Sequence, residues 1–89
     1  MSKVFIVLQD NDESRYILQA IQQDNPAATV IHQPALIRIE TENLLVIRRE
    51  TVEEKMGRDW NVQELHLSLI TIGGNVDEDD DQLTLSWNS

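Results

Sequence analysis

The side chains that could do chemistry in this 89-residue chain are few and scattered. There is no Cys, so neither a thiolate nucleophile nor a thiolate metal site can form. Hydrolysis through an activated Ser is not indicated either, because nothing resembles the G-x-S-x-G nucleophile elbow. His32 and His66 each stand alone in a strand-like pattern, which is typical of surface or hydrogen-bonded residues. We predict no catalytic residue and no metal ligand, while a small enzyme that uses an unrecognised pair of carboxylates stays open as an alternative.

Two further motifs could bind ions. The run from Asp77 to Asp81 reads D-E-D-D-D and begins with the D-x-D-x-D spacing of a calcium loop. Such a loop needs Gly at its sixth position and a bidentate Glu at its twelfth, where this chain has Gln82 and Asn88. Gly73-Gly74 is too short to cradle a phosphate without a longer glycine motif. We therefore predict a solvated acidic turn, a flexible glycine corner and no cofactor.

Charge and length narrow the classes of partner. The formal net charge is −9, with 16 acidic residues against 7 Lys plus Arg. This field repels a phosphate backbone and an anionic membrane, whereas it suits a basic groove on another protein. The apolar run from Val4 to Leu8 is too short for a signal peptide or a membrane span. The sequence predicts one cytoplasmic domain over residues 1–89 that binds neither nucleic acid nor membrane.

The first half of the chain has the pattern of one strand, one helix and three strands. Apolar and β-branched residues predict a buried strand at Lys3–Gln9. Asp10 and Glu13 form a D-x-x-E helix start, and Asn25-Pro26 stops this helix after Asp24. The next three strands are predicted at residues 28–33, 35–40 and 44–48.

Two short helices should follow. Thr51 with Glu54 fits a T-x-x-E capping box, and Gly57 supplies the left-handed residue that ends a helix. Asn61 with Glu64 repeats the signal as N-x-x-E. We expect Trp60 between the two helices to be a core anchor.

The last third of the chain is predicted to be mainly strand. Leu65, Leu67 and Leu69 alternate with His66, Ser68 and Ile70, which favours a strand over a helix. Residues 82–87 alternate clearly and predict a last strand with Leu83, Leu85 and Trp87 inward. The order is β-α-β-β-β, then α-α-β-β-β. We predict an α+β fold whose mostly antiparallel sheets, in two halves, share one core.

Several segments together resemble a known family. They read I-Q-Q-D-N-P from Ile21, V-I-R-R-E-T-V-E-E-K-M-G-R-D-W from Val46, Q-E-L from Gln63 and G-G-N-V-D-E-D-D-D-Q-L-T-L-S-W from Gly73. The chain is similar to the cofactorless effector, or coupling, proteins of bacterial multicomponent diiron monooxygenases, above all to the regulatory components of phenol hydroxylases. The resemblance covers most of the chain.

The resemblance implies a function without catalysis. A protein of this family binds the hydroxylase component, which holds a carboxylate-bridged diiron centre in a helical bundle. Docking alters access to the active site, raises turnover and couples NADH oxidation to aromatic hydroxylation, with functional interplay with the iron–sulfur flavin reductase. A generic acidic adaptor domain with another basic target remains the alternative.

The same resemblance places part of the docking face at the glycine corner. In relatives the segment that matches residues 67–74 lies toward the hydroxylase and reads closer to S-S-F-A-G, whereas here it is L-S-L-I-T-I-G-G. We expect an apolar side chain beside a small-residue turn to press into a groove, while a core role for Ile70 and Ile72 stays open. Exposed arginines would add rim ion pairs of about 0.2–1 kcal/mol each. The candidate partner-binding residues are Thr71, Ile72, Gly73, Gly74, Arg48, Arg49 and Arg58.

Overall fold

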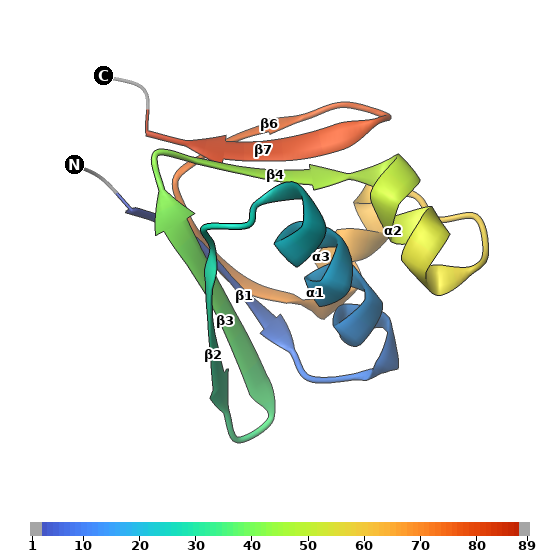
Figure 1. Cartoon of the computed structure of the whole chain (residues 1–89), viewed down its shortest axis with the longest axis horizontal. Helices are drawn as coiled ribbons and strands as arrows, with labels where there is room; N and C mark the ends of the chain where they lie inside the picture. The colour runs from blue at the N-terminus through green and yellow to red at the C-terminus, as the bar shows by residue number, and fades with distance from the viewer. Residues whose placement is uncertain (1–2, 88–89) are drawn as a thin grey trace.

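Two antiparallel sheets diverge from the end of the molecule where the described chain begins and ends, and the helices fill the open side between them (Figure 1). The computed structural model describes residues 3–87. Its elements are β1 (Lys3–Gln9), α1 (Asp12–Asp24), β2 (Thr29–Gln33), β3 (Leu36–Glu42), β4 (Leu44–Arg48), α2 (Arg49–Met56), the 3-10 helix η1 (Val62–Glu64), α3 (Leu65–Ser68), β5 (Leu69–Gly73), β6 (Asn75–Glu78) and β7 (Gln82–Ser86). This order confirms the predicted α+β class and its succession of elements.

Each sheet takes one strand from the other half of the chain. The four-stranded sheet has the order β2-β3-β1-β5, and the three-stranded sheet has the order β4-β7-β6. β5 therefore pairs with β1 of the first half, while β4 pairs with β7 of the second. The two halves are interlocked, because neither sheet can form from one half alone.

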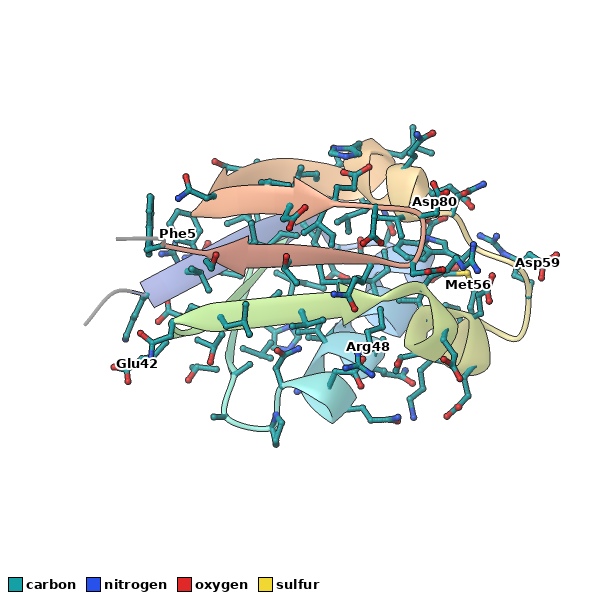
Figure 2. All side chains as sticks on the ribbon, turned by 90° about the horizontal axis from the view of Figure 1, so that it is seen from above. Phe5, Glu42, Arg48, Met56, Asp59 and Asp80 are labelled. Atoms are coloured by element: carbon teal, nitrogen blue, oxygen red, sulfur yellow. The ribbon has the colours of Figure 1, made fainter. Side chains whose placement is uncertain are left out.

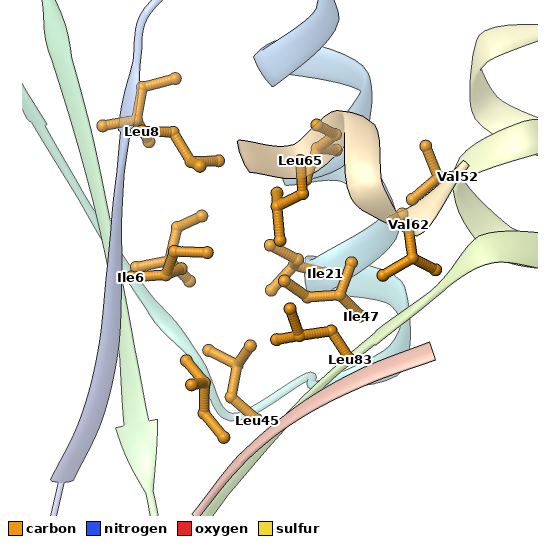
Figure 3. Close-up of a cluster of buried hydrophobic side chains, with 14 of the residues drawn as sticks. Ile6, Leu8, Ile21, Leu45, Ile47, Val52, Val62, Leu65 and Leu83 are labelled. Carbon is orange, nitrogen blue, oxygen red and sulfur yellow. The ribbon is translucent and has the colours of Figure 1, made fainter. Parts of the chain in front are cut away.

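The core lies between the two sheets and the helices (Figure 3). Ile6 and Leu8 of β1 face it from one side, and Leu45 of β4 and Leu83 of β7 face it from the other. Ile21 of α1 fills the space between them. The alternation predicted for β3 is confirmed, since its isoleucines at 37 and 39 are buried. Trp60 is likewise a core residue, as predicted.

The helix ends agree with the local signals only in part. Gly57 ends α2 with φ 78°, and Asn61 and Glu64 form the predicted capping box, which here begins η1. The box predicted at Thr51 is wrong, because α2 already begins at Arg49 and Thr51 lies buried in its first turn. The reason is tertiary: the Arg49 amide donates to the Asp81 carbonyl at 2.8 Å, so the acidic hairpin caps α2. 

The start of α1 and the end of β7 also differ from the sequence patterns. Asn11, rather than Asp10, caps α1, and its side chain accepts from the Ser14 amide at 2.8 Å. The prediction that Trp87 faces inward is wrong, because this residue lies beyond β7 and is 48% exposed. Its indole Nε1 donates to the Lys3 carbonyl at 2.7 Å. This bond, rather than burial, holds the Trp87 ring beside β1.

The strand predicted through Leu65 and Leu67 is wrong. Leu65–Ser68 is one turn of helix, and the strand begins only at Leu69. The capping box at Asn61 starts a helical turn that continues through η1 into α3. Leu65 is fully buried by this turn, which overrides the alternating pattern.

The outward face of the four-stranded sheet carries a charged cluster that gives a testable pH dependence. Arg38 Nε donates to Glu40 Oε2 at 3.1 Å, and the Arg38 guanidinium lies 4.0 Å from the centre of the Phe5 ring. Lys3 Nζ lies 3.6 Å from the other oxygen of Glu40. The hydrogen bond from Arg38 is the main cause that lowers the pKa of the Glu40 carboxyl, and the charge of Lys3 adds to it.

We expect an NMR titration to place the pKa of Glu40 below its ordinary value. A lowered folded-state pKa stabilises the fold above the unfolded pKa of about 4.3, and this contribution is lost as the pH falls through the folded pKa. Arg38→Met should raise the pKa of Glu40 more than Lys3→Met does. A larger shift in the Lys3 variant would contradict the assigned cause.

Candidate docking site

β5 and β6 form a continuous edge of the protein. β5 is an edge strand of the four-stranded sheet and β6 an edge strand of the three-stranded sheet. They follow each other directly in the chain and are joined at Gly74. We call residues 69–78 the β5–β6 edge. Edge strands present backbone groups and side chains that another protein can cover.

The glycine corner of this edge is shaped by close contacts. Gly73 is buried beneath Phe5, and a Cβ at this position would lie 2.0 Å from Cε1 of the Phe5 ring. Gly74 has φ +143°, which side chains rarely tolerate, and a Cβ there would lie 3.2 Å from Val4. Both glycines are therefore required by geometry, Gly73 by space and Gly74 by backbone conformation.

The structure separates the predicted docking residues of β5 into two faces. Thr71 is exposed, whereas Ile72 is half-buried, pairs with Ile6 and packs against the core. The core alternative therefore describes Ile72 better than the docking role does. Replacing Ile72 by Asp would therefore disturb folding as well as docking, so this substitution does not test docking alone.

Apolar side chains are exposed along and just before this edge. Ile70 and Val76 are the exposed large hydrophobic residues within it, and Leu67 of α3 precedes it by two residues. Leu67 is 77% exposed, more than any other large apolar side chain in residues 3–87. The strand alternation is wrong at Leu67, because it places this residue on the same side as the buried Leu65. It does place Ile70 on the face opposite Leu69, which agrees with the exposure of Ile70. No sequence signal marks Leu67 as exposed.

Two of the predicted arginines are tied to other parts of this protein. Arg49 lies 3.4 Å from Asp81 and so joins α2 to the acidic hairpin. Arg58 lies 3.3 Å from Glu13 and 3.8 Å from Glu64, which joins the loop after α2 to α1 and η1. These ion pairs support a structural role for both arginines. 

The arginines also lie away from the glycine corner. Arg48 pairs with Gln82 at the first residue of β7, while Asn75, next to the corner, pairs with Ser86 at its last. In Figure 2, Phe5 and Asp59, the neighbour of Arg58, lie at opposite ends of the molecule. The structure therefore does not bring Arg48 or Arg58 into one patch with Thr71 and the two glycines.

The groups considered for ion chemistry have local partners. Asp79 Oδ1 accepts from the amides of Asp81 and Gln82, at 2.8 and 2.9 Å, which makes the acidic run a hairpin turn as predicted. His66 Nε2 lies 2.8 Å from Glu78 Oε1, which joins α3 to β6. Within the described chain, no three potential ligand side chains gather in a way that could hold a metal ion. Nor is any helix between residues 3 and 87 long and apolar enough to cross a membrane.

A sheet edge flanked by exposed apolar side chains is typical of a protein that acts by binding another protein. The chain belongs to the MmoB/DmpM family, whose model matches residues 2–86. It is 61% identical over 88 residues to the phenol 2-monooxygenase stimulatory component DmpM of Pseudomonas sp. (strain CF600), with 99% of this chain and 98% of that protein covered. The resemblance found in the sequence motifs is thus confirmed.

Solved structures agree with this assignment. A chain of a phenol hydroxylase–regulatory protein complex matches with a TM-score of 0.93 and 61% identity, covering 98% of this chain and 100% of that one. The regulatory protein B of soluble methane monooxygenase matches with a TM-score of 0.76 and 18% identity, covering 97% of this chain and 65% of that chain. At that identity the second match shows the shared fold only.

Proposed function

We propose that this protein is the non-catalytic stimulatory component of a multicomponent phenol monooxygenase and that it binds the diiron hydroxylase component. The near full-length identity of 61% to a stimulatory component of phenol 2-monooxygenase carries the proposal. A chain equally similar to this one is part of a solved phenol hydroxylase–regulatory protein complex, which supports the same partner. The acidic composition and the lack of Cys suit a cytoplasmic site of action.

The mechanism that we propose is a shift of the hydroxylase between conformations. A bound protein can favour the active conformation only if it binds that conformation more tightly than the resting one. The iron chemistry belongs to the hydroxylase, while this chain supplies binding energy and a shape. Turnover and the coupling of NADH oxidation to hydroxylation would rise together, which also makes the reductase a functional partner.

We propose the β5–β6 edge as the docking face. Thr71 presents a side chain there, and the half-buried Gly74 lets a partner approach the backbone closely, while Gly73, buried beneath Phe5, sets the shape of the corner. Ile72 supports the strand from the core side. Arg48 remains a candidate for a rim contact, whereas Arg49 and Arg58 form ion pairs within the protein.

The proposal is tested by titrating the protein into the purified hydroxylase and its reductase with phenol and NADH. We expect catechol formation and the yield of catechol per NADH to rise and to saturate near the concentration of hydroxylase sites. Reactions without the protein, and the protein without hydroxylase, are the controls. If the folded protein changes neither rate nor yield with its cognate hydroxylase, the stimulatory role is wrong and a generic adaptor becomes the better interpretation.

A further inference from the structure

Two consecutive irregularities of the chain turn apolar side chains outward. The first is α3, a single helical turn where the sequence alternates like a strand. Residues in a helix are about 100° apart, so Leu67 points away from Leu65 by about 200°, whereas a strand would place both on one side. Leu65 is fully buried, and Leu67 is 77% exposed.

The second irregularity is a bulge at Ile70. Val7 of β1 pairs with Thr71, but the next residue, Leu8, pairs with Leu69, so that Ile70 is the extra residue. Leu69 packs against the core, while Ile70 is 45% exposed. A bulge bends a strand and re-aims a side chain, and bulges are frequent beside functional sites.

The helical turn that carries Leu67 is fastened through its three other residues. One turn of helix is not stable by itself, so α3 depends on its tertiary contacts. Ser68 is buried, and its hydroxyl accepts from Asn11 Nδ2 at 3.2 Å. His66 contacts Glu78 of β6 at 2.8 Å, and Leu65 is anchored in the core. Three of the four residues of α3 are thus fastened, and the fourth is the exposed leucine.

We propose that Leu67 and Ile70 form the apolar anchor of the docking face and that they enter an apolar pocket on the hydroxylase component. This inference rests on the proposed function. Because the backbone of α3 is already fastened, binding has to order only the two apolar side chains, which lowers the entropic cost of docking. The pair adjoins Thr71 and the glycine corner, so it extends the proposed face toward α3.

Charge argues against a second copy of this chain as the occupant. With a net charge of −9, two copies repel each other, and Glu64 and Glu78 flank α3. A pocket with a neutral or basic rim on another protein avoids this repulsion. An apolar centre with acidic surroundings therefore fits a partner that is a different protein and not a second copy of this chain.

The anchor is tested with matched pairs of truncations at exposed positions. Leu67→Ala is compared with Leu44→Ala on β4, where the side chain is 50% exposed, and Ile70→Ala with Ile31→Ala on β2, where it is 37% exposed. Affinity for the complete hydroxylase is measured by calorimetry, and activation by titration. We expect Leu67→Ala and Ile70→Ala each to weaken binding at least tenfold, with full activation at saturation, and both controls to stay within twofold of the unchanged protein.

The outcomes separate this inference from the proposed function. If the unchanged protein activates the hydroxylase but the anchor and control variants bind equally well, the anchor is overturned and the stimulatory role stands. If the unchanged protein itself neither binds nor activates, the proposed function fails and the anchor fails with it. Leu67→Asp adds a stricter check: its unfolding midpoint should stay unchanged while its binding is lost, and retained binding would contradict the anchor.

Discussion

Gly73→Ala is expected to destabilise the protein by about 1–3 kcal/mol, the usual effect of overpacking, and to weaken docking on the hydroxylase. The new Cβ would lie 2.0 Å from Cε1 of Phe5 and 2.4 Å from its Cδ1, so the ring must move. The Arg38 guanidinium stacks on this ring at 4.0 Å, so its displacement disturbs a second strand. Gly73→Val should have a larger effect, because two methyl groups would follow the Cβ into the same space. Denaturant unfolding and hydroxylase titration measure the two consequences.

A rescue and a control distinguish this clash from a general glycine effect. Phe5→Ala removes the ring, so the double variant with Gly73→Ala should be more stable than the sum of the single changes predicts. Gly57→Ala is the control, because Gly57 has φ +78° and no atom within 4 Å of its new Cβ. It should show only the backbone strain of about 1–2 kcal/mol and unchanged docking. Additive effects of Gly73→Ala and Phe5→Ala would contradict the steric explanation.

Asn25→Asp, which replaces the side-chain NH2 group by an oxygen, is expected to destabilise the protein by about 3–4 kcal/mol. The Asn25 amide donates from Nδ2 to the carbonyls of Ile21 at 2.8 Å and Val46 at 2.7 Å, and its Oδ1 accepts from the Val46 amide at 3.0 Å. It thereby ends α1 and pairs with the edge of β4 that no strand covers. A carboxylate keeps the acceptor but places negative charge against two carbonyl oxygens. Thermal and urea unfolding will measure the loss.

The pH dependence of this variant provides the decisive control. Contact with two carbonyl oxygens raises the pKa of the new carboxyl in the folded state above the unfolded value of about 3.9. The charge penalty is therefore complete above the folded pKa and disappears as the pH falls below the unfolded value. The cost of one lost donor remains, because a protonated carboxyl has one O–H where the amide donates two hydrogen bonds. Asn25→Ala lacks the charge, so its smaller destabilisation should not share this pH dependence. Parallel pH profiles for the two variants would refute the electrostatic explanation.

Some features could be predicted because their causes are local. The Asn61–Glu64 capping box needs only residues three apart, and it forms as predicted. Gly57 needs only its own backbone conformation, and the acidic hairpin is closed by Asp79 through bonds to its near neighbours. Leu83 and Leu85 alternate with polar residues because only one face of β7 is buried in the core. The family resemblance also followed from motifs that can be read along the chain.

Other features depended on contacts between distant residues. The start of α2 moved to Arg49 because the carbonyl of Asp81 is available to its amide. Leu65–Ser68 became a helix because burying Leu65 and bonding Ser68 to Asn11 outweigh the preference for a strand. Arg58 was expected at a docking rim, but it meets Glu13, which lies 45 residues away in the chain. No periodicity in the sequence contains this information.

The sequence by itself determined the class of fold, the order of its elements, the family and a candidate docking segment around Gly73. Only the tertiary structure decided how the two halves exchange strands and which side chains of that segment face outward. The physical reason is that propensity and capping act within one turn or one strand, whereas the orientation of a side chain depends on the register between strands. One helical turn was enough to turn Leu67 away from the face expected for it, and a single bulge shifts the register of the strand at Ile70.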